Sequence, residues 1–442
     1  SESRRVLTRC LLQIRAAPQL RTAMELRGHW MEVLSVAFAP DGQRLASADK
    51  SGRVLLWKLT GELFRVLCGH SDPVRCVAWS PNGERLASAG EGGRVLLWDV
   101  AGGDASSFCV LRVLRRHTGK VVSLAWAPNG QCLASAGADS RIVLWSLVER
   151  PDRGCEDPDD FGVLSELRGH SGLVTSISWS AGGDRIASGC VDEALFLWKA
   201  AGVDSSEHGF LTELEARRAR SRYNHAEAVT CVAWSPSGSR LASADADGKL
   251  LLWSTEGGDP KNYCFLSGLE AHEDAIRVVA WHPNDGMLAS AGDESTVFLW
   301  NVAGVDADQF AHLLELHGHE GTVSTMAWSP SGDLLVTAGE DKRVLIWRVR
   351  GPDVTKCKFD RELYGTTLRD VQASLTCAAA RARTCTVLPP RSRSRGNDRV
   401  DTADRTASVA IALSWRKAAR RPSALNSKES RSGSATQAQG SK

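Results

Sequence analysis

The chain has 442 residues, of which 43% are hydrophobic, and its 54 Lys and Arg residues nearly balance 52 Asp and Glu residues, leaving a net charge of +2. No apolar run approaches the ~18–20 residues that cross a membrane, so we expect no membrane span. The 12 cysteines include no Cys-x-x-Cys pair. This argues against a disulfide framework and indicates reduced thiols in the cytoplasm or nucleus. We also expect no cofactor.

The first segment, residues 1–19, contains several arginines and a single acidic residue, Glu2. Its composition predicts a disordered N-terminal extension. The segment also faintly resembles a transit peptide.

From residue 20 to 350 the chain is organised by a repeat, in which seven tryptophans each lie 28 residues after a histidine. Successive histidines lie 41, 47, 53, 55, 47 and 47 residues apart, so connections of variable length join a fixed unit. Such periodicity indicates an array of one structural module and not a single domain around a buried active site. The pairs are His29/Trp57, His70/Trp98, His117/Trp145, His170/Trp198, His225/Trp253, His272/Trp300 and His319/Trp347.

Each unit is predicted to form four short antiparallel strands. The second copy holds the runs VRCVAWS, RLASAG and RVLLW, separated by Pro-Asn-Gly and by a glycine-rich stretch. Short β-rich runs between such residues are typical of strands joined by tight turns. A fourth run precedes each histidine with the pattern Leu-x-x-Leu-x-x-His or close to it, as in Leu164–Leu167–His170. A four-stranded sheet of this kind must stack on its neighbours to bury both faces.

The repeat resembles the WD-repeat family, whose blades open on Gly-His and close on Trp-Asp. Four of the seven histidines keep the Gly-His dipeptide, and Trp98-Asp99 keeps the literal Trp-Asp. The resemblance covers residues 20–350 and implies an all-β fold, a seven-bladed WD-repeat β-propeller.

The family's buried tetrad joins the histidine, a hydroxyl ten residues before the tryptophan, an aspartate six residues before it, and the tryptophan itself. The resemblance implies four complete tetrads: His117, Ser135, Asp139 and Trp145; His170, Ser188, Asp192 and Trp198; His225, Ser243, Asp247 and Trp253; and His319, Thr337, Asp341 and Trp347. Blades one, two and six carry Ser51, Gly92 and Glu294 at the acid position. We expect these three blades to be softer, because a buried donor there lacks its acceptor. No tetrad residue is assigned to catalysis or to metal binding.

A second aromatic set lies 19 residues before these tryptophans and is predicted to be apolar filling. It comprises Phe38, Trp79, Trp126, Trp179, Trp234, Trp281 and Trp328.

Each fourth strand lies before the next histidine. The run Met24–Leu26 should therefore be the outer strand of the last blade, pairing with the strand that ends at Trp347 and closing the ring.

In the WD-repeat family, partners usually bind the top face, which is built by the loops with the histidines and the turns with the tetrad aspartates. Carried over by position, charged top-face candidates are Glu32, Lys50, Arg75, Lys120, Arg277, Asp293 and Glu340. Blades four and five are uncharged at these positions, with Leu173 and Val191 as apolar candidates. An apolar anchor with a charged rim is typical of a recognition surface.

One connection departs from the repeat. Leu214 lies eleven positions before His225, whereas the corresponding leucine of the other blades lies three positions before its histidine. The inserted segment carries Arg217, Arg218, Arg220, Arg222 and Tyr223. Arginine forks suit carboxylates and phosphates, so this segment predicts an acidic or phosphorylated partner, although it equally fits a solvated loop.

Residues 351–442 form a basic low-complexity tail with 18 Lys and Arg against 8 Asp and Glu, a net charge of +10. This composition predicts disorder. Nucleic acid is expected as a partner only through this tail.

Phosphate-binding loops, nucleophile elbows and zinc-protease motifs are all missing from the sequence. We therefore expect a non-catalytic protein-interaction scaffold, a monomeric propeller within a larger complex. One alternative is the propeller that targets cytosolic iron–sulfur assembly, although Ala138 stands where that family carries an arginine. The other is a substrate receptor of a cullin-type ubiquitin ligase, since Trp347-Arg348-Val349-Arg350 partly matches its Trp-Asp-x-Arg motif.

Overall fold

The computed structural model describes residues 24–101, 108–147, 162–200, 208–214, 224–257, 259–270, 272–304 and 310–349. They all lie in the first of two compact units of the chain, Ser1–Thr384. The predicted extension 1–19, the tail 351–442 and the arginine insertion 215–223 lie outside the described residues.

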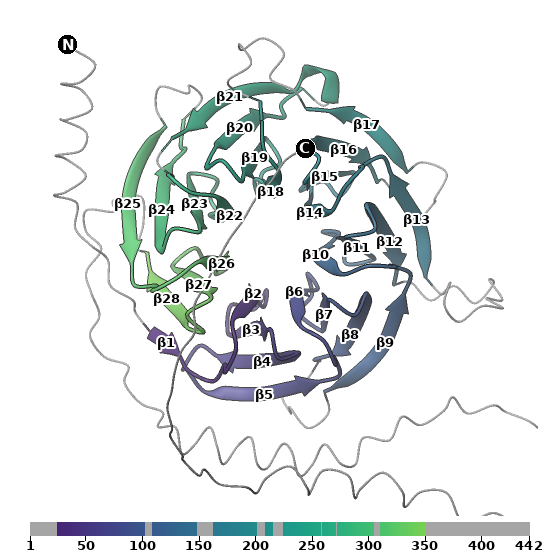
Figure 1. The fold of residues 1–442 in the computed structure, drawn as a ribbon, viewed down its shortest axis with the longest axis vertical. Coiled ribbons are helices and arrows are strands. Elements are labelled where there is room, and N and C mark those ends of the chain that lie inside the picture. Colours follow the sequence, from purple (N-terminus) through teal and green to yellow (C-terminus); the bar gives the residue numbers. More distant parts are fainter. Residues whose placement is uncertain are drawn as a thin grey trace, which may run out of the picture. The chain divides into compact units, whose positions relative to one another are not determined.

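Twenty-eight strands in the described residues form seven four-stranded antiparallel sheets arranged as a ring (Figure 1). The all-β, seven-bladed propeller that the sequence predicts is thus confirmed. Strands β2, β6, β10, β14, β18, β22 and β26 line the centre of the ring (Figure 1). In the part of the chain that the structure describes, the one helical element is a single 3-10 turn, Pro260–Asn262, and no helix is long and apolar enough to cross a membrane.

The strand bounds follow the repeat closely. Blades one to three consist of β2 (Val33–Phe38), β3 (Arg44–Asp49), β4 (Arg53–Lys58) and β5 (Leu63–Cys68); β6 (Val74–Trp79), β7 (Arg85–Gly90), β8 (Arg94–Asp99) and β9 (Cys109–Arg115); and β10 (Val121–Trp126), β11 (Cys132–Gly137), β12 (Arg141–Ser146) and β13 (Val163–Arg168). Blades four and five consist of β14 (Val174–Trp179), β15 (Arg185–Cys190), β16 (Leu195–Lys199) and β17 (Gly209–Glu213); and β18 (Val229–Trp234), β19 (Arg240–Asp245), β20 (Leu250–Ser254) and β21 (Cys264–Leu269). Blades six and seven consist of β22 (Ile276–Trp281), β23 (Met287–Gly292), β24 (Thr296–Asn301) and β25 (Ala311–His317); and β26 (Val323–Trp328), β27 (Leu334–Gly339), β28 (Val344–Arg348) and β1 (Met24–Leu26).

The ring closes as the sequence predicts. β1 pairs antiparallel with β28, with Met24 opposite Ile346 and Leu26 opposite Val344. Leu26 is 2% exposed and packs in one hydrophobic cluster with Val344 and Ile346. The last blade is therefore made from both ends of the array.

The hydrophobic core is divided among the seven joints of the ring. Each of the seven clusters of buried side chains takes its members from two adjacent blades. A blade on its own would expose both faces of its sheet to water, at about 25 cal/mol per Å² of apolar surface. Stability therefore comes chiefly from stacking blades on each other.

The second aromatic set does more than fill space. Five of its indole N–H groups donate to a backbone carbonyl of the preceding blade, at 2.9–3.2 Å. The donors are Trp79, Trp126, Trp179, Trp281 and Trp328. Trp234 is equally buried, but its indole nitrogen meets no acceptor among the described residues.

Candidate interaction surface

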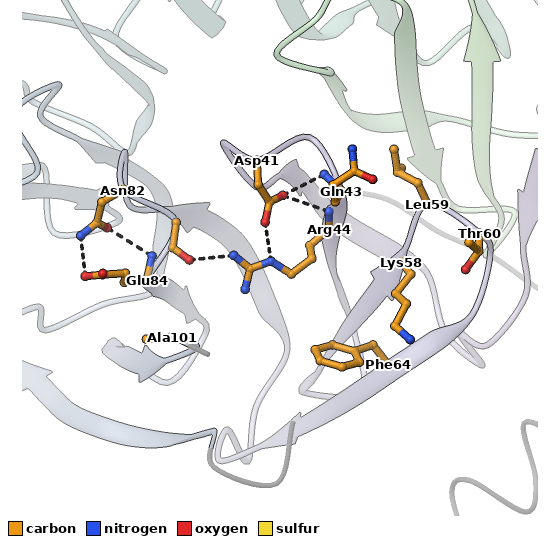
Figure 2. A pocket seen from close by; sticks show the side chains of 11 residues that line it. Asp41, Gln43, Arg44, Lys58, Leu59, Thr60, Phe64, Asn82, Glu84 and Ala101 are labelled. Carbon is orange, nitrogen blue, oxygen red and sulfur yellow. Dashed lines mark hydrogen bonds and ion pairs between the residues drawn. The ribbon is translucent and has the colours of Figure 1, made fainter. Parts of the chain in front are cut away.

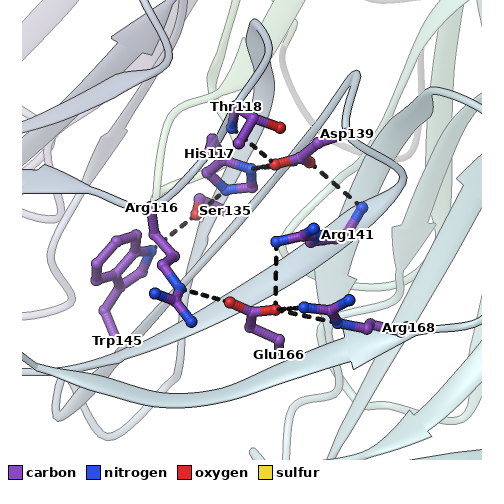
Figure 3. A network of polar contacts seen from close by, with 9 residues as sticks. All are labelled: Arg116, His117, Thr118, Ser135, Asp139, Arg141, Trp145, Glu166 and Arg168. Carbon is purple, nitrogen blue, oxygen red and sulfur yellow. Dashed lines mark hydrogen bonds and ion pairs between the residues drawn. The ribbon is translucent and has the colours of Figure 1, made fainter. Parts of the chain in front are cut away.

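The tetrad of blade three shows how each histidine is held (Figure 3). Trp145 donates its indole N–H to Ser135 Oγ at 2.8 Å, and His117 Nε2 lies 2.7 Å from the same hydroxyl. The hydroxyl has one proton, which it donates to Nε2, so the proton of the neutral imidazole sits on Nδ1. From there it is donated to Asp139 at 2.9 Å.

The same chain of contacts recurs around the ring. In every blade the histidine Nε2 lies 2.6–2.8 Å from the hydroxyl that accepts the indole N–H. The acids predicted for blades three, four and seven, Asp139, Asp192 and Asp341, lie 2.7–3.2 Å from their histidines.

The prediction for blades one and five was wrong. His225 Nδ1 donates to Asp245 at 2.8 Å, whereas Asp247 is exposed and pairs with Lys249. Blade one, predicted to lack its acid, has one: His29 Nδ1 donates to Asp49 at 2.8 Å. Both acids lie eight residues before the tryptophan instead of six, at the end of the second strand.

Blades two and six remain incomplete. Within the described ranges His70 Nδ1 meets no acidic acceptor, and burial together with the nearby charge of Arg94 lowers the pKa of His70 to about 4. In blade six, Glu294 reaches only to 3.5 Å from His272 Nδ1, which is left without a hydrogen bond. Burial likewise lowers the pKa of His272 to about 4.

The tetrads contain the Ser–His–Asp order of contacts that hydrolases use, but their geometry argues against catalysis. Ser135 is fully buried, and one of its lone pairs already accepts the Trp145 indole. A nucleophile must be reachable by its substrate, and these hydroxyls are closed off between strands. The tetrads serve to fix each blade.

Blade four brings together a group of potential metal ligands, His170, Cys190 and Asp192, whose ligand atoms all lie within 4.8 Å of one another. His170 already donates to Asp192, and Cys190 occupies the place where Asp49 and Asp245 stand in their blades. Burial raises the pKa of the Cys190 thiol to about 12. We interpret the thiol as a neutral filler of the alternative acid position.

The predicted top-face residues do share one rim. In each blade the N–H of the residue after the second strand donates to the carbonyl of the third residue after the histidine, at 2.9–3.1 Å. In blades one and four, for example, these bonds join Lys50 to Glu32 and Val191 to Leu173. At the fifth residue after the histidine, two residues after that carbonyl, each innermost strand has a bulge. A bulge re-aims the extra side chain, and here that residue is Arg75 in blade two and Arg277 in blade six.

Most of the predicted charges on this rim neutralise one another. Ion pairs join Lys50 to Glu32 at 2.9 Å, Arg75 to Glu91 at 2.7 Å, and Arg277 to Asp293 at 2.7 Å. Lys120 and Glu340 form no ion pair within the described part of the chain.

Blades four and five differ, because their rim has no charged side chain among the positions predicted from the repeat. Val191 is 43% exposed, and Leu173 lies next to it, half-buried. Thr175 and Thr230 turn their hydroxyls onto carbonyls of the next blade, Val229 and Ile276. At these rim positions the sector is therefore apolar and its hydroxyls are internally satisfied, while the exposed acids Glu193 and Asp247 stand in the adjoining turns.

The opposite face of the ring holds a pocket of about 570 Å³ between blades one and two (Figure 2). No motif in the sequence predicted this pocket. Arg44 crosses it to donate to the carbonyls of Val100 and Gly83 at 3.0 Å and pairs with Asp41 at 2.7 Å. Arg240 similarly reaches the Val302 carbonyl across the joint of blades five and six. These arginines join neighbouring blades, so we assign the pocket's charges to the fold.

Comparison with known proteins agrees with this geometry. The chain matches the family model "WD domain, G-beta repeat" seven times, at residues 20–58, 61–99, 108–146, 161–199, 217–254, 263–301 and 310–348. It also resembles several curated proteins, and each of these similarities covers less than a quarter of this chain.

THO complex subunit 3 of Arabidopsis thaliana is 30% identical over 23% of this chain and 30% of that protein. Protein HIRA of Homo sapiens is 32% identical over 21% of this chain and 10% of that protein. The probable cytosolic iron-sulfur protein assembly protein 1 of Kluyveromyces lactis is 27% identical over 23% of this chain and 30% of that protein. The matched stretches thus span less than a third of these relatives. With seven matched repeats and seven four-stranded blades, the chain belongs to the WD-repeat family.

Proposed function

We propose that this chain is a non-catalytic protein-interaction scaffold that binds its partner on the top face, with blades four and five as the anchor. The observation that carries the proposal is Val191, which is 43% exposed at rim positions without charge, beside blade six, whose Arg277 is already paired with Asp293. Burying exposed apolar side chains drives association, and satisfied ion pairs at the rim supply orientation.

The partner we favour carries an acidic or phosphorylated segment. The suggestion comes from the arginine insertion that follows Leu214 of blade four directly in the sequence, with Arg217, Arg218, Arg220, Arg222 and Tyr223. Guanidinium groups would hold the anionic segment while Val191 and Leu173 receive an apolar residue.

Roles in named complexes stay alternatives to this general one. The similarity to the THO, HIRA and iron-sulfur proteins is almost equal, at 27–32% identity, and so reflects the shared repeat. Ala138 stands at the rim position where the iron–sulfur family has arginine.

The test compares three variants of the full chain by quantitative co-purification. Val191→Asp should lose the partners that the unchanged chain retains, because a charge replaces the apolar anchor. Changing the four inserted arginines to Ser should weaken the same interactions and reduce their dependence on salt.

Leu211→Asp is the matched control, since Leu211 is 37% exposed on the outer strand of the same blade. It should keep the full set of partners. If Val191→Asp keeps them as well, with an unchanged melting temperature, the top-face assignment is wrong.

A further inference from the structure

A cluster of one acid and several cations recurs on the outer two strands of the blades. In blade three, Glu166 lies four residues before the histidine and is contacted by Arg168 at 2.5 Å and Arg141 at 3.5 Å (Figure 3). Arg116, which follows the outer strand of blade two, reaches the same carboxylate at 2.5 Å. Burial would raise the pKa of Glu166, but these hydrogen bonds hold it below its usual value.

Two other blades repeat the arrangement at the same positions. In blade seven, Glu25 lies four residues before His29 and is contacted by Arg27 at 3.0 Å and by Arg343 at 3.8 Å. In blade six, Glu315 is contacted by His317 at 3.1 Å. The basic residues stand two residues before the histidine and, where a second is present, four residues before the tryptophan.

Blade two keeps both cations of this arrangement and lacks the acid. Arg94 and Arg115 are directly opposite each other on β8 and β9, as Arg141 and Arg168 are on β12 and β13. The place of Glu166 is taken by Val113, which is 41% exposed.

Neither arginine finds a full substitute for the missing carboxylate. Arg115 is exposed and makes no hydrogen bond or ion pair to the described residues. Arg94 donates to Ser71 at 2.9 Å and lies 3.6 Å from Asp72. Two guanidinium groups directly opposite on adjacent strands repel each other unless an anion lies between them. Blade two also lacks the tetrad acid, so no tetrad carboxylate offsets the positive charges of Arg94 and Arg115.

Exposed apolar side chains adjoin these cations. Val110, Leu111 and Val113 of β9 are 39%, 44% and 41% exposed, and together they are three of the eight large hydrophobic side chains exposed in the described residues. β9 is the outermost strand of its sheet, with β8 as its one strand neighbour there. Edges of this kind accept an added extended segment.

We propose that β9, with Arg94 and Arg115, is a second interaction surface that binds an extended acidic segment of a partner protein. One Asp or Glu carboxylate of that segment takes the place that Glu166 fills in blade three. Apolar residues on either side of it cover Val110, Leu111 and Val113. These aliphatic contacts favour a peptide over a nucleic acid, whose backbone offers charge alone. The surface lies on the outer circumference of the ring, apart from the top-face anchor at Val191.

The test measures fluorescence anisotropy of a labelled (Val-Glu)4 peptide with the full chain, and (Val-Gln)4 is the neutral probe. Changing Arg94 and Arg115 to Ser should weaken (Val-Glu)4 binding at least about tenfold, which corresponds to about 1.4 kcal/mol, within the range of charge-assisted hydrogen bonds. The control variant changes Arg27 and Arg343 to Ser. It removes the same charge where Glu25 is already present, and binding should stay within about twofold.

Val113→Glu provides a second, independent arm. It supplies the carboxylate that blade two lacks, so it should abolish (Val-Glu)4 binding without lowering the melting temperature, whereas Val113→Gln should retain binding. Equal binding of (Val-Gln)4, equal losses in the two double-arginine variants, or retained binding in Val113→Glu would each overturn the proposal. Displacement of the peptide by inorganic phosphate at a comparable concentration would also overturn it, since the site would then be a phosphate site. None of these variants alters Val191, so the top-face proposal stands or fails separately.

Discussion

At the scale of single residues, a carboxylate accepts a hydrogen bond from the tetrad histidine in five of the seven blades. Asp49 is fully buried and accepts from His29 at 2.8 Å, from the Ser51 N–H at 2.9 Å and from Arg53 at 3.0 Å. Burial alone would raise the pKa of Asp49, but the hydrogen bonds from His29 and Ser51 lower it to about 2. The carboxylate thus stays charged because several donors converge on it.

Asp49→Ala should therefore destabilise the protein by about 1–3 kcal/mol, because it leaves buried donors without an acceptor. Asp247→Ala is the matched control in blade five, and it should cost less than about 0.5 kcal/mol, as surface changes usually do. Urea denaturation of both variants measures the difference. Equal losses would mean that Asp49 does not hold its tetrad together.

These two aspartates also show where the sequence was insufficient. The earlier position ends the second strand and the later one lies in the turn that follows, and an acid at either place reaches the histidine Nδ1 at 2.7–3.2 Å. Spacing alone selected Asp247 and Ser51, because three other blades use the later position. The histidines, hydroxyls and tryptophans lie at one fixed spacing in all seven blades and could be read directly.

Burial lowers the pKa of several tetrad histidines; for His29 and His170 a partner acid opposes this, and for His70 and His272 no tetrad acid does. His70 and His272 have a pKa of about 4 in the folded protein, against an ordinary value of 6.5. Between these pH values the two histidines bind protons in the unfolded chain but not in the folded protein. Their contribution to the free energy of unfolding is therefore fully present above pH 6.5 and is lost as the pH falls toward 4.

Gly92→Asp should make this fall shallower. It places a carboxylate where Asp139 and Asp341 stand in their blades, which raises the pKa of His70 in the folded state, provided that Asp72 turns aside to make room. The unfolding free energy that is lost between pH 7 and pH 5 should be smaller in this variant than in the unchanged protein by about 1–2 kcal/mol. Urea denaturation at pH 7, 6 and 5 measures it, and Gly92→Asn is the uncharged control. A slope identical to that of the unchanged protein would contradict the role given to His70.

At the scale of elements, the joints between blades carry polar contacts that a hydrophobic pattern does not reveal. Trp126 donates its indole N–H to the Ala78 carbonyl of the preceding blade at 2.9 Å. The sequence correctly placed these aromatics in the core, but their period gave no reason to expect a hydrogen bond. The acceptor belongs to another repeat, 48 residues away in the chain.

Trp126→Phe and Trp234→Phe distinguish the contribution of this hydrogen bond to stability from that of side-chain packing. Each substitution replaces a buried indole by a phenyl ring, but only Trp126→Phe removes a hydrogen bond. Trp126→Phe should cost about 1 kcal/mol more than Trp234→Phe, the usual net value of such a bond. Thermal unfolding followed by circular dichroism compares them. A larger loss at Trp234 would show that its indole nitrogen has a partner in solution.

At the scale of the whole molecule, stability depends on closing the ring, because every blade is stacked between two others. The outer strands are the least regular part of the repeat, and they follow connections of very different length. Sequence spacing nevertheless placed β1 correctly, since Leu26 keeps the distance of three residues to His29 that five other blades show. The charge clusters around Glu166 and Glu25 were not foreseen, because each needs the register of two strands and, for Arg116, the neighbouring blade.

Deleting residues 20–27 should destabilise the entire propeller and not a single edge. The deletion removes Leu26 from the cluster it shares with Val344 and Ile346, and it exposes the edge of β28. With the joint of blades seven and one open, the unfolding transition should shift to lower temperature as one cooperative step. Deleting residues 1–19 is the control and should leave the melting temperature nearly unchanged. Calorimetry distinguishes the outcomes: an unchanged transition after removal of 20–27 would mean that the ring does not need β1, and a separate early transition would mean that blade seven unfolds alone.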